Sequence, residues 1–350
     1  MPIRGKNADF SNKIRAGLAG SHADRQIASV HQAFILGAGL GTRLRPLTSR
    51  LPKPLIPLFH KSLAERALDT CETIGIRRFA INTHHLPELW RDETFGIPNG
   101  AWTRPGLAGG NGLPAEFGHW HDRPVHLFQE PDLLETGGGL KNLVHWIEDG
   151  PLLIHNGDIF TTMPLQRLVD QHQASGLPVT LALRSVGEAQ HIAIDENGTR
   201  VTDIRNKLGR SDGTHLFSGI YCVNREFLDY LPAGEKVSVI PAFLKLAEEG
   251  RLGAVVLDDG HWMDLGDRAS YLQAHRELDL GPLIHPDAKV DPRAIVERSA
   301  VGPGAVIEAG AVVRDSVVWP GATILGDAAI DGCIVWSDRP VSGPHADADL

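Results

Sequence analysis

A period of six residues runs through the C-terminal part of the chain. Branched aliphatic residues recur between Ile284 and Ile330 at intervals of six, with two intervals of five. A small residue follows most of them four positions later, as Ala288 follows Ile284. A β-hairpin would instead alternate with a period of two. A period of six is typical of a left-handed parallel β-helix, in which each hexapeptide forms one face of a triangular coil, and it predicts about three coils here.

The sequence before and after these repeats has a different character, and the chain divides into four predicted parts. The region before the repeats alternates apolar runs with segments of helical spacing, whereas the first residues are polar and mixed in charge. The last residues are acidic and contain proline and glycine, so this tail is expected to fray. The predicted parts are an N-terminal extension over 1–30, an α/β domain over 31–280, the β-helix over 281–337 and the tail over 338–350.

Strands and helices alternate along the predicted α/β domain. Short apolar runs predict buried strands, and apolar residues three and four positions apart predict helices. This alternation favours an open α/β sheet with crossover helices. The stretch 96–123 is rich in glycine and proline, follows neither period and is predicted to be a long loop. The predicted strands are 33–36, 78–82, 124–128, 151–155 and 179–183, and the predicted helices are 62–74, 140–147 and 165–173.

Charge and cysteine content narrow the class of protein. The 350 residues carry 34 Lys and Arg against 43 Asp and Glu, a formal net charge of −9, whereas a general nucleic-acid binder would carry a basic excess. The three cysteines lie far apart without metal-ligand spacing, which suits a reducing compartment. There is no run of 18 apolar residues and no apolar N-terminal segment. We therefore expect a cytoplasmic protein with neither a membrane nor a nucleic acid as partner.

A glycine-rich turn directly follows the first predicted strand. Gly37, Gly39 and Gly41 occupy alternate positions, which lets the backbone pass close to a ligand and point N–H groups at phosphate oxygens. The spacing matches neither the dinucleotide fingerprint nor the P-loop. Arg43 follows the turn, and Lys53 lies between two prolines that hold its backbone rigid. Together these residues indicate a site for a polyphosphate.

Five segments in this order resemble the signature of the sugar-1-phosphate nucleotidylyltransferases, and their order and spacing cover about 33–276. Many members of that family also carry hexapeptide repeats. The resemblance implies a Rossmann-like open mixed sheet of the nucleotide-diphospho-sugar transferase type over 31–280, followed by the short left-handed β-helix. The segments are GAGLGTRLRPLTSRLPKPLIPL from position 37, ETGGGLKN from 135, NGD from 156, FSGI from 217 and WMDLG from 262.

The reaction that this resemblance implies needs positive charge more than a general base. An oxygen of a sugar 1-phosphate attacks the α-phosphorus of a nucleoside triphosphate (NTP), and pyrophosphate leaves. The nucleophile is already an anion at neutral pH because phosphate monoesters have a second pKa near 6. Repulsion between anions is then the main obstacle, and cations and Mg²⁺ relieve it. By resemblance, Arg43, Lys53 and Asp158 are catalytic, and Asp158 and Asp264 hold Mg²⁺.

The same resemblance implies two sets of binding residues, and three assignments have simpler readings. Asp158 could serve only a turn, Asp264 could cap a helix that begins near position 267, and Lys207 could be an ordinary exposed loop lysine. The implied nucleotide-binding residues are Leu36, Gly37, Ala38, Gly39, Gly41, Thr42, Gln129, Gly137 and Gly138. The implied sugar-phosphate-binding residues are Asn82, Asn156, Lys207, Ser218 and Gly219.

The substrates and the purpose of the β-helix stay open at this point. The form LETGGG resembles both mannose-1-phosphate guanylyltransferase-like proteins and muramate-phosphate uridylyltransferases, and the β-helix favours the former. GTP with mannose 1-phosphate is therefore the leading pair, with UTP and N-acetylmuramate 1-phosphate or glucose 1-phosphate as alternatives. A catalytically silent regulatory or scaffold homologue is a hypothesis of another class. We expect the β-helix to mediate homo-oligomerisation or to pack against the catalytic domain.

Overall fold

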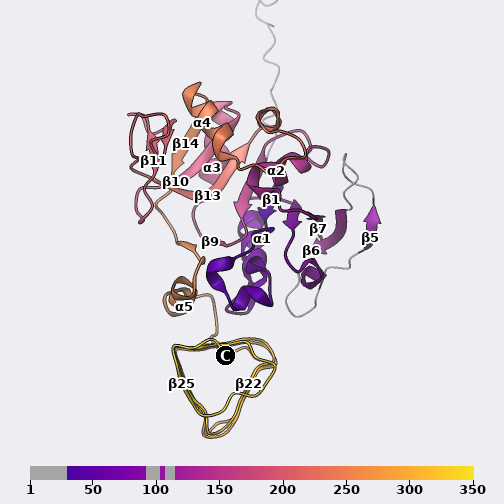
Figure 1. Ribbon diagram of the computed structural model, residues 1–350, viewed down its shortest axis with the longest axis vertical. Coiled ribbons are helices and arrows are strands. Elements are labelled where there is room, and N and C mark those ends of the chain that lie inside the picture. The colour runs from indigo at the N-terminus through magenta and orange to yellow at the C-terminus, as the bar shows by residue number, and fades with distance from the viewer. Residues whose placement is uncertain (1–29, 92–102, 107–114) are drawn as a thin grey trace, which may run out of the picture.

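The computed structural model describes residues 30–91, 103–106 and 115–350. The predicted extension over 1–30 therefore lies outside the described residues except for its last position. The chain forms a body of sheet and helices and, beyond helix α5 (Arg268–Glu277), a triangular coil (Figure 1). Within the described ranges, no helix is both long enough and apolar enough to cross a membrane.

The body is built on a mixed nine-stranded sheet, which confirms the expected open α/β sheet. Its centre is parallel, with β1 between β4 and β8, while β13 and β6 run antiparallel to their neighbours. In sheet order, the strands are β14 (Leu252–Val256), β10 (Val179–Arg184), β13 (Leu216–Val223), β8 (Leu152–Asn156), β1 (Gln32–Leu36), β4 (Arg78–Thr83), β7 (Arg123–Gln129), β6 (Ala115–Trp120) and β5 (Thr103–Gly106).

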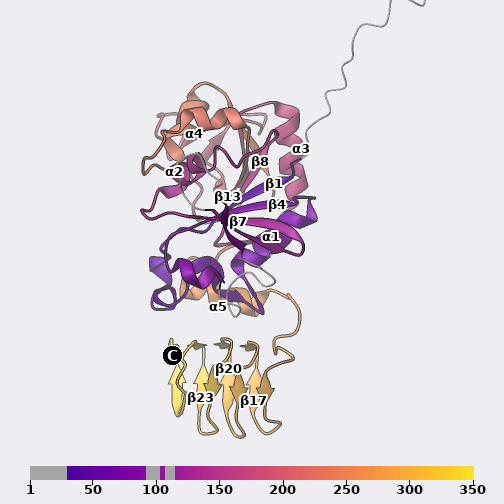
Figure 2. The same ribbon diagram turned by 90° about the vertical axis from the view of Figure 1, so that its right-hand side faces the viewer.

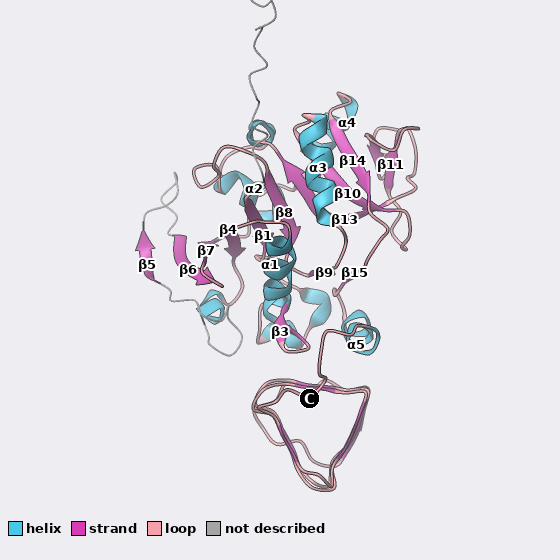
Figure 3. Cartoon of the chain, turned by 180° about the vertical axis from the view of Figure 1, so that it is seen from behind, coloured by secondary structure: helices cyan, strands magenta, loops and turns pink. Residues whose placement is uncertain are grey.

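Helices cover both faces of this sheet (Figures 2 and 3). Helices α1 (Leu63–Thr73) and α3 (Leu165–Ser175) pack on one face, and α2 (Glu135–Asn142) and α4 (Ile240–Glu248) pack on the other. Ser62 caps the start of helix α1: its hydroxyl accepts from the Glu65 amide, while the Glu65 carboxylate accepts from the Ser62 amide. This reciprocal cap satisfies two amides that the first turn would otherwise leave free.

The second predicted helix is displaced toward the N-terminus. It was expected over 140–147, but α2 begins at Glu135 and ends at Asn142. Glycines have low helix propensity, which argued against a helix through the triplet at 137–139. The structure compensates for it: the amides of Gly137 and Gly138 both donate to the carbonyl of Val237, on a segment a hundred positions away.

Shorter elements complete the body. The 3₁₀ helices lie mainly in the segment between β1 and α1, and a last helix, α5, leads toward the coil. These elements are the paired strands β2 (Pro57–Leu58) and β3 (Lys61–Ser62), β9 (Ile159–Thr161) and β15 (Trp262–Asp264), and β11 (Ile192–Ile194) and β12 (Val201–Ile204). The 3₁₀ helices are η1 (Thr42–Leu44), η2 (Leu47–Ser49), η3 (Lys53–Leu55), η4 (Pro87–Arg91) and η5 (Arg225–Tyr230), and α5 is Arg268–Glu277.

The prediction of one long loop over 96–123 is wrong in part. Strands β5 and β6 lie within this stretch and extend the main sheet beyond β7 in antiparallel pairing. Because the segment is rich in glycine and proline, its sequence lacks the strict alternation that marks a strand. The edge of β7 presents backbone groups that need hydrogen-bond partners, and pairing with them stabilises β6 as a strand. The rest of the stretch, 92–102 and 107–114, lies outside the described residues.

The C-terminal repeats form the predicted left-handed β-helix, seen end-on in Figure 1 and from the side in Figure 2. Strands stack in parallel on three faces, and the side chains that point inward form a core of their own. The faces are β16 (Lys289–Val290), β19 (Val306–Ile307) and β22 (Thr323–Ile324); β17 (Ile295–Glu297), β20 (Val312–Arg314), β23 (Ala329–Asp331) and β25 (Pro344–Ala346); and β18 (Ala300–Val301), β21 (Val317–Val318) and β24 (Ile334–Val335).

The two five-residue intervals mark one corner of the coil. Equivalent residues on successive coils are 17 positions apart, as Arg298 and Asp315 are. At this corner Arg298, Asp315 and Gly332 have φ of 46°, 45° and 60°. Two residues join the flanking strands at this corner, 298–299 and 315–316, whereas four join them at the other two corners, as 302–305 and 308–311 do. The Arg298 guanidinium also donates to the Asp315 carboxylate one coil further on, along the stack.

The tail over 338–350 does not fray but continues the coil. Strand β25 pairs with β23, and Ala348 and Leu350 pack against the core of the β-helix. The last coil would otherwise expose its apolar edge and unpaired backbone groups. Arg268 of α5 also holds the tail, with its Nε donating to Asp349 at 2.8 Å.

The β-helix packs against the body, which is one of the two roles expected for it. The outer face of β18, β21 and β24 joins the core that lies beneath α1 and α3. At this contact the indole N–H of Trp319 donates to the Tyr271 hydroxyl at 3.1 Å, and that hydroxyl donates to the carbonyl of Pro57. Homo-oligomerisation stays a prediction.

Two adjacent valines of β20 test the inward and outward faces of the coil. Val313 is fully buried inside it, while Val312 is half-buried on its outside. We expect Val313→Ala to cost about 2–3 kcal/mol, from lost apolar burial and the cavity left behind. Val312→Ala should cost less than about 1 kcal/mol. Urea unfolding followed by circular dichroism measures both, and equal losses would contradict this orientation.

Candidate active site

A cavity of about 420 Å³ opens at the carboxyl ends of the central strands. The parallel register sets Leu36 opposite both Asn82 and Asn156, so three strand ends meet at one edge of the sheet. Ligands of open α/β sheets bind at this edge. The predicted residues that line the cavity are Leu36, Ala38, Gly39, Gly41, Thr42, Arg43, Lys53, Asn82, Asn156 and Asp158.

The glycine-rich turn is held against the segment that carries Lys53. Gly41 has φ of 58°, and a Cβ there would lie 2.8 Å from the Thr48 methyl group and 3.0 Å from Lys53 Cβ. The position therefore needs glycine both for its conformation and for the close approach. The Thr48 hydroxyl donates to the Gly41 carbonyl at 2.9 Å. The turn and Lys53 thus form one wall of the cavity.

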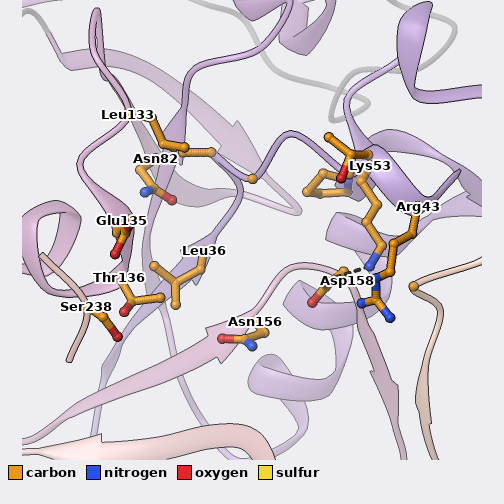
Figure 4. Close-up of a pocket in the computed structure, with 16 residues that line it drawn as sticks. Leu36, Arg43, Lys53, Asn82, Leu133, Glu135, Thr136, Asn156, Asp158 and Ser238 are labelled. Atoms are coloured by element: carbon orange, nitrogen blue, oxygen red, sulfur yellow. Dashed lines mark hydrogen bonds and ion pairs between the residues drawn. The ribbon is translucent and has the colours of Figure 1, made fainter. Parts of the chain in front are cut away.

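Lys53 is a buried cation shared by two carboxylates. It begins the 3₁₀ helix η3 between Pro52 and Pro54, and only 6% of its side chain is exposed. Its Nζ lies 2.6 Å from Asp158 Oδ2 and 3.6 Å from Asp264 Oδ1. Figure 4 shows the Lys53 side chain reaching Asp158 beside Arg43. The proline frame aims the ammonium as the sequence suggested.

A small two-stranded ribbon brings the two aspartates together. Asp158 directly precedes β9, and Asp264 ends β15, where it lies opposite Ile159 in the antiparallel pair. The amide of Leu265 donates to the carbonyl of Asp158 at 3.3 Å. Asp264 does not cap the helix that follows, because Asp267 takes that position. Asp158 lies in a turn but also pairs with Lys53, so it does more than shape the chain.

Arg43 completes the charged end of the cavity. Its guanidinium lies 3.6 Å from Asp264 Oδ2 and is 65% exposed. A Cβ at Gly266 would lie 2.5 Å from this guanidinium, so a larger residue there would displace the arginine from its present position. The end of the cavity therefore presents two cations and two carboxylates, and Arg43 stays accessible to a ligand.

The carboxylate pair fits a divalent cation with hard oxygen preference. Asp264 Oδ1 is buried and accepts no hydrogen bond, and its contact with the Lys53 ammonium is long, at 3.6 Å, so a lone pair of this oxygen can serve another ligand. Among the described residues, no group of three or more His, Cys, Asp or Glu could hold a metal alone. Mg²⁺ does not need one, since it commonly uses one or two carboxylates together with substrate phosphates and water.

The opposite end of the cavity carries residues that sequence reasoning missed. Leu133, Glu135, Thr136 and Ser238 lie there, away from Lys53 and Asp158 (Figure 4). The first three flank the glycine triplet, and that position was the available signal. No pattern in the sequence singled out Ser238.

Eight predicted residues do not line the cavity. Two of them, Gly37 and Asp264, contact the lining residues Asn82 and Lys53, and the other six lie elsewhere. Gln129 is exposed at the end of β7, Lys207 is exposed in the turn after β12, and Ser218 is buried with its hydroxyl donating to the Ala182 carbonyl. A Cβ at Gly219 would lie 2.7 Å from the Asn156 amide, behind the cavity wall. Gly137 and Gly138 face the backbone of the segment 235–238. Their roles as binding residues stay predictions.

Asn82 has its polar groups turned toward the protein. Its Oδ1 accepts from the amide of Gly37 at 2.7 Å, and its Nδ2 donates to Glu130 Oε1 at 2.7 Å. Glu130 is only 1% exposed, and its Oε2 accepts from the amide of Leu134 at 3.0 Å. Burial raises the pKa of the Glu130 carboxyl, and the hydrogen bonds from Asn82 and Leu134 oppose that rise. No motif in the sequence pointed to Glu130.

Comparison with known proteins places this geometry in a family. A mannose-1-phosphate guanylyltransferase of Mycobacterium tuberculosis is 28% identical over 290 residues, which cover 77% of this chain and 74% of that one. A UTP–glucose-1-phosphate uridylyltransferase of Synechocystis is 27% identical over 262 residues, covering 70% of this chain and 62% of its own length. A D-glycero-alpha-D-manno-heptose 1-phosphate guanylyltransferase of Aneurinibacillus thermoaerophilus is 25% identical over 249 residues, which cover 71% of this chain and 98% of that one.

A solved structure supports the fold independently. A Bacillus anthracis protein that carries the assignment glucose-1-phosphate thymidylyltransferase aligns with a TM-score of 0.57 at 16% identity, over 72% of this chain and 97% of that one. The model of the family described as nucleotidyl transferase matches residues 32–280, the region that holds the sheet and all the cavity residues. The chain therefore belongs to the nucleotidyl transferase family.

Proposed function

We propose that this chain condenses GTP with mannose 1-phosphate to give GDP-mannose and pyrophosphate. The broader reaction, transfer of a nucleotidyl group to a sugar 1-phosphate, follows the sugar-1-phosphate nucleotidyltransferases among its relatives. The observation that carries it is the charged end of the cavity, where Lys53 contacts Asp158 and Asp264 beside Arg43. The family match over 32–280 supports our placement of the catalytic domain at 31–280.

Lys53 and Arg43 supply the fixed positive charge that the reaction between two anions needs. A phosphate oxygen of the sugar 1-phosphate attacks the α-phosphorus, the bond to the bridging oxygen breaks, and pyrophosphate leaves with the electron pair. Both reactants are anions, so fixed cations lower the barrier more than a base would. The buried ammonium of Lys53 suits the α-phosphate, and the exposed guanidinium of Arg43 suits the leaving pyrophosphate. The turn from Gly37 to Gly41 adds backbone amides along the phosphates.

Mg²⁺ is the cofactor that we assign to the carboxylate pair. Asp158 and Asp264 would hold it, and Asp264 Oδ1, which accepts no hydrogen bond, is the oxygen that we assign to it first. When bound, the ion would neutralise phosphate charge and orient the reacting groups. Lys53 already lies against Asp158, so it keeps the two carboxylates close together and offsets part of their repulsion.

The cavity gives the nucleotide a direction. With the phosphates at the charged end, the base lies at the other end, near Leu133, Thr136 and Ser238. Asn156 lies between the two ends (Figure 4), and we assign it to the sugar phosphate. Guanine is our proposal because guanylyltransferases are prominent among the relatives.

UTP with glucose 1-phosphate is the second candidate, and the Synechocystis relative favours it. A catalytically silent scaffold is the alternative of another class. It needs no contact between cations and carboxylates in the cavity, whereas this chain brings four such groups within 3.6 Å of a partner.

Pyrophosphate release should identify the substrates and the contribution of Asp158. Purified protein with Mg²⁺ is assayed against the four NTPs and a set of sugar 1-phosphates, and we expect the highest rate with GTP and mannose 1-phosphate. Asp158→Asn should lower kcat at least about 100-fold. The control is Asp259→Asn, which breaks only an exposed ion pair with Arg167 and should leave kcat unchanged. Turnover of no pair would overturn the proposed function.

The metal assignment predicts a change in Mg²⁺ dependence. Chelation by EDTA should abolish activity, and added Mg²⁺ should restore it. Asp264→Asn removes one charged ligand, so the Mg²⁺ concentration that gives half-maximal activity should rise about tenfold. Asp279→Asn, at an exposed position after α5, should leave that concentration unchanged. An unaltered Mg²⁺ titration for Asp264→Asn would argue against its role as a ligand.

Substituting two lysines in turn distinguishes the effect of a cation in the cavity from the effect of net charge on kcat. Lys53→Met removes the buried ammonium, and kcat should fall about 100-fold because the α-phosphate loses its fixed cation. Lys61→Met removes a partly exposed ammonium that pairs with Asp69 at 2.7 Å, and kcat should stay within about twofold. Steady-state kinetics of both variants provide the measurement. Equal effects would mean that only net charge matters.

A further inference from the structure

Glu130 is a buried carboxylate for which the reaction above has no use. It follows the last residue of β7 and is 1% exposed. Within the described ranges no lysine or arginine forms an ion pair with it. A buried carboxylate without a counter-ion is costly unless hydrogen bonds stabilise it. Hydrogen bonds must therefore stabilise the Glu130 carboxylate, which lies next to a site proposed for anionic substrates.

The contacts of Glu130 join the two ends of the cavity. One oxygen accepts from Asn82, which in turn accepts from Gly37 at the start of the phosphate turn. The other oxygen accepts from the amide of Leu134, which lies between the cavity residues Leu133 and Glu135. The Leu134 carbonyl is also fixed, because the amide of Val237 donates to it at 3.0 Å. One carboxylate thus fixes groups on three separate segments.

We propose that Glu130 is a positioning residue that sets the phosphate turn and the base end of the cavity at a fixed distance for the nucleotide. The inference rests on the proposed function of this cavity. Through Asn82, Glu130 fixes the peptide of Gly37, and through Leu134 it fixes the loop that flanks the base. A nucleotide that spans both ends then binds without ordering either, which lowers the free-energy cost of binding.

The chemistry of the contacts requires a carboxylate rather than an amide. Both neighbours donate, and only an ionised carboxylate accepts at both oxygens. A glutamine would turn an N–H₂ group toward either Asn82 or the Leu134 amide and lose one contact. Gly139 packs directly against this carboxylate, since a Cβ there would lie only 2.8 Å from Glu130 Oε1.

The first experiment compares two buried glutamates. Glu130→Gln should raise KM for GTP and the dissociation constant of GTP, measured by calorimetric titration, about tenfold. Its kcat and its KM for the sugar 1-phosphate should stay within about twofold, since the chemistry at Lys53 is untouched. The control is Glu65→Gln. Glu65 is 7% exposed and accepts from the Ser62 amide at the start of α1, outside the cavity, and its loss should leave both constants unchanged.

A second experiment restores the contacts with the opposite polarity. In Asn82→Asp/Glu130→Gln, the glutamine N–H₂ donates to the new aspartate, which still accepts from Gly37, and the glutamine oxygen still accepts from Leu134. The charge of the pair stays the same. We expect the double variant to recover KM for GTP to within about threefold of the wild type. This reversal also tests the proposal if Glu130→Gln alone folds poorly.

The outcomes separate this inference from the proposed function. GTP binding by Glu130→Gln equal to that of Glu65→Gln would overturn the positioning role, and so would a double variant no better than the single one. Wild-type protein that binds GTP but turns over no sugar 1-phosphate would overturn the proposed reaction. In that case the calorimetric comparison would still support or overturn the role of Glu130.

Discussion

The contact of one ammonium with two carboxylates organises the site. Three features bring Lys53 to Asp158 and Asp264. Prolines on both sides restrict the backbone of the lysine, a glycine at position 41 leaves room beside it, and the ribbon of β9 and β15 brings the two aspartates together. The ribbon also brings the chain from β15 back to the body immediately before α5, against which the β-helix packs. The charged end of the cavity and the start of α5 therefore depend on the same short ribbon.

The acidic net charge of the chain makes this local arrangement necessary. A protein with a formal charge of −9 gives little long-range attraction to two polyanionic substrates. Attraction has to come from groups within a few ångströms, where the low dielectric of a partly buried site strengthens each contact. The structure concentrates positive charge at one end of the cavity and, through Glu130, uses a buried negative charge away from that end only to order backbone.

What the sequence could predict depended on how local each signal was. The six-residue period and the proline frame of Lys53 act within a few positions, so both were predicted correctly in structural terms. The amides of the glycines at 137 and 138 donate to the carbonyl of Val237, and no local pattern reveals a contact over a hundred positions; their assignment to the nucleotide stays a prediction. Glu130 was missed for a similar reason, because its role depends on hydrogen bonds with Asn82 and Leu134 that no sequence motif indicates. Strand β6 was missed because its pairing partner, not its sequence pattern, stabilises it.

The two ends of helix α5 contact different coils of the β-helix. Arg276 contacts Asp315, whereas Arg268 contacts Asp349 and the carbonyl of Gly332, on later coils. Eight helical residues span about 12 Å, and two steps between adjacent strands span about 9.6 Å, so the two arginines match the spacing of the stack. A chain could gain or lose 17 residues without disturbing the corners, but the last coil would then miss Arg268. Two arginines of one helix thus attach different coils of the stack to the body.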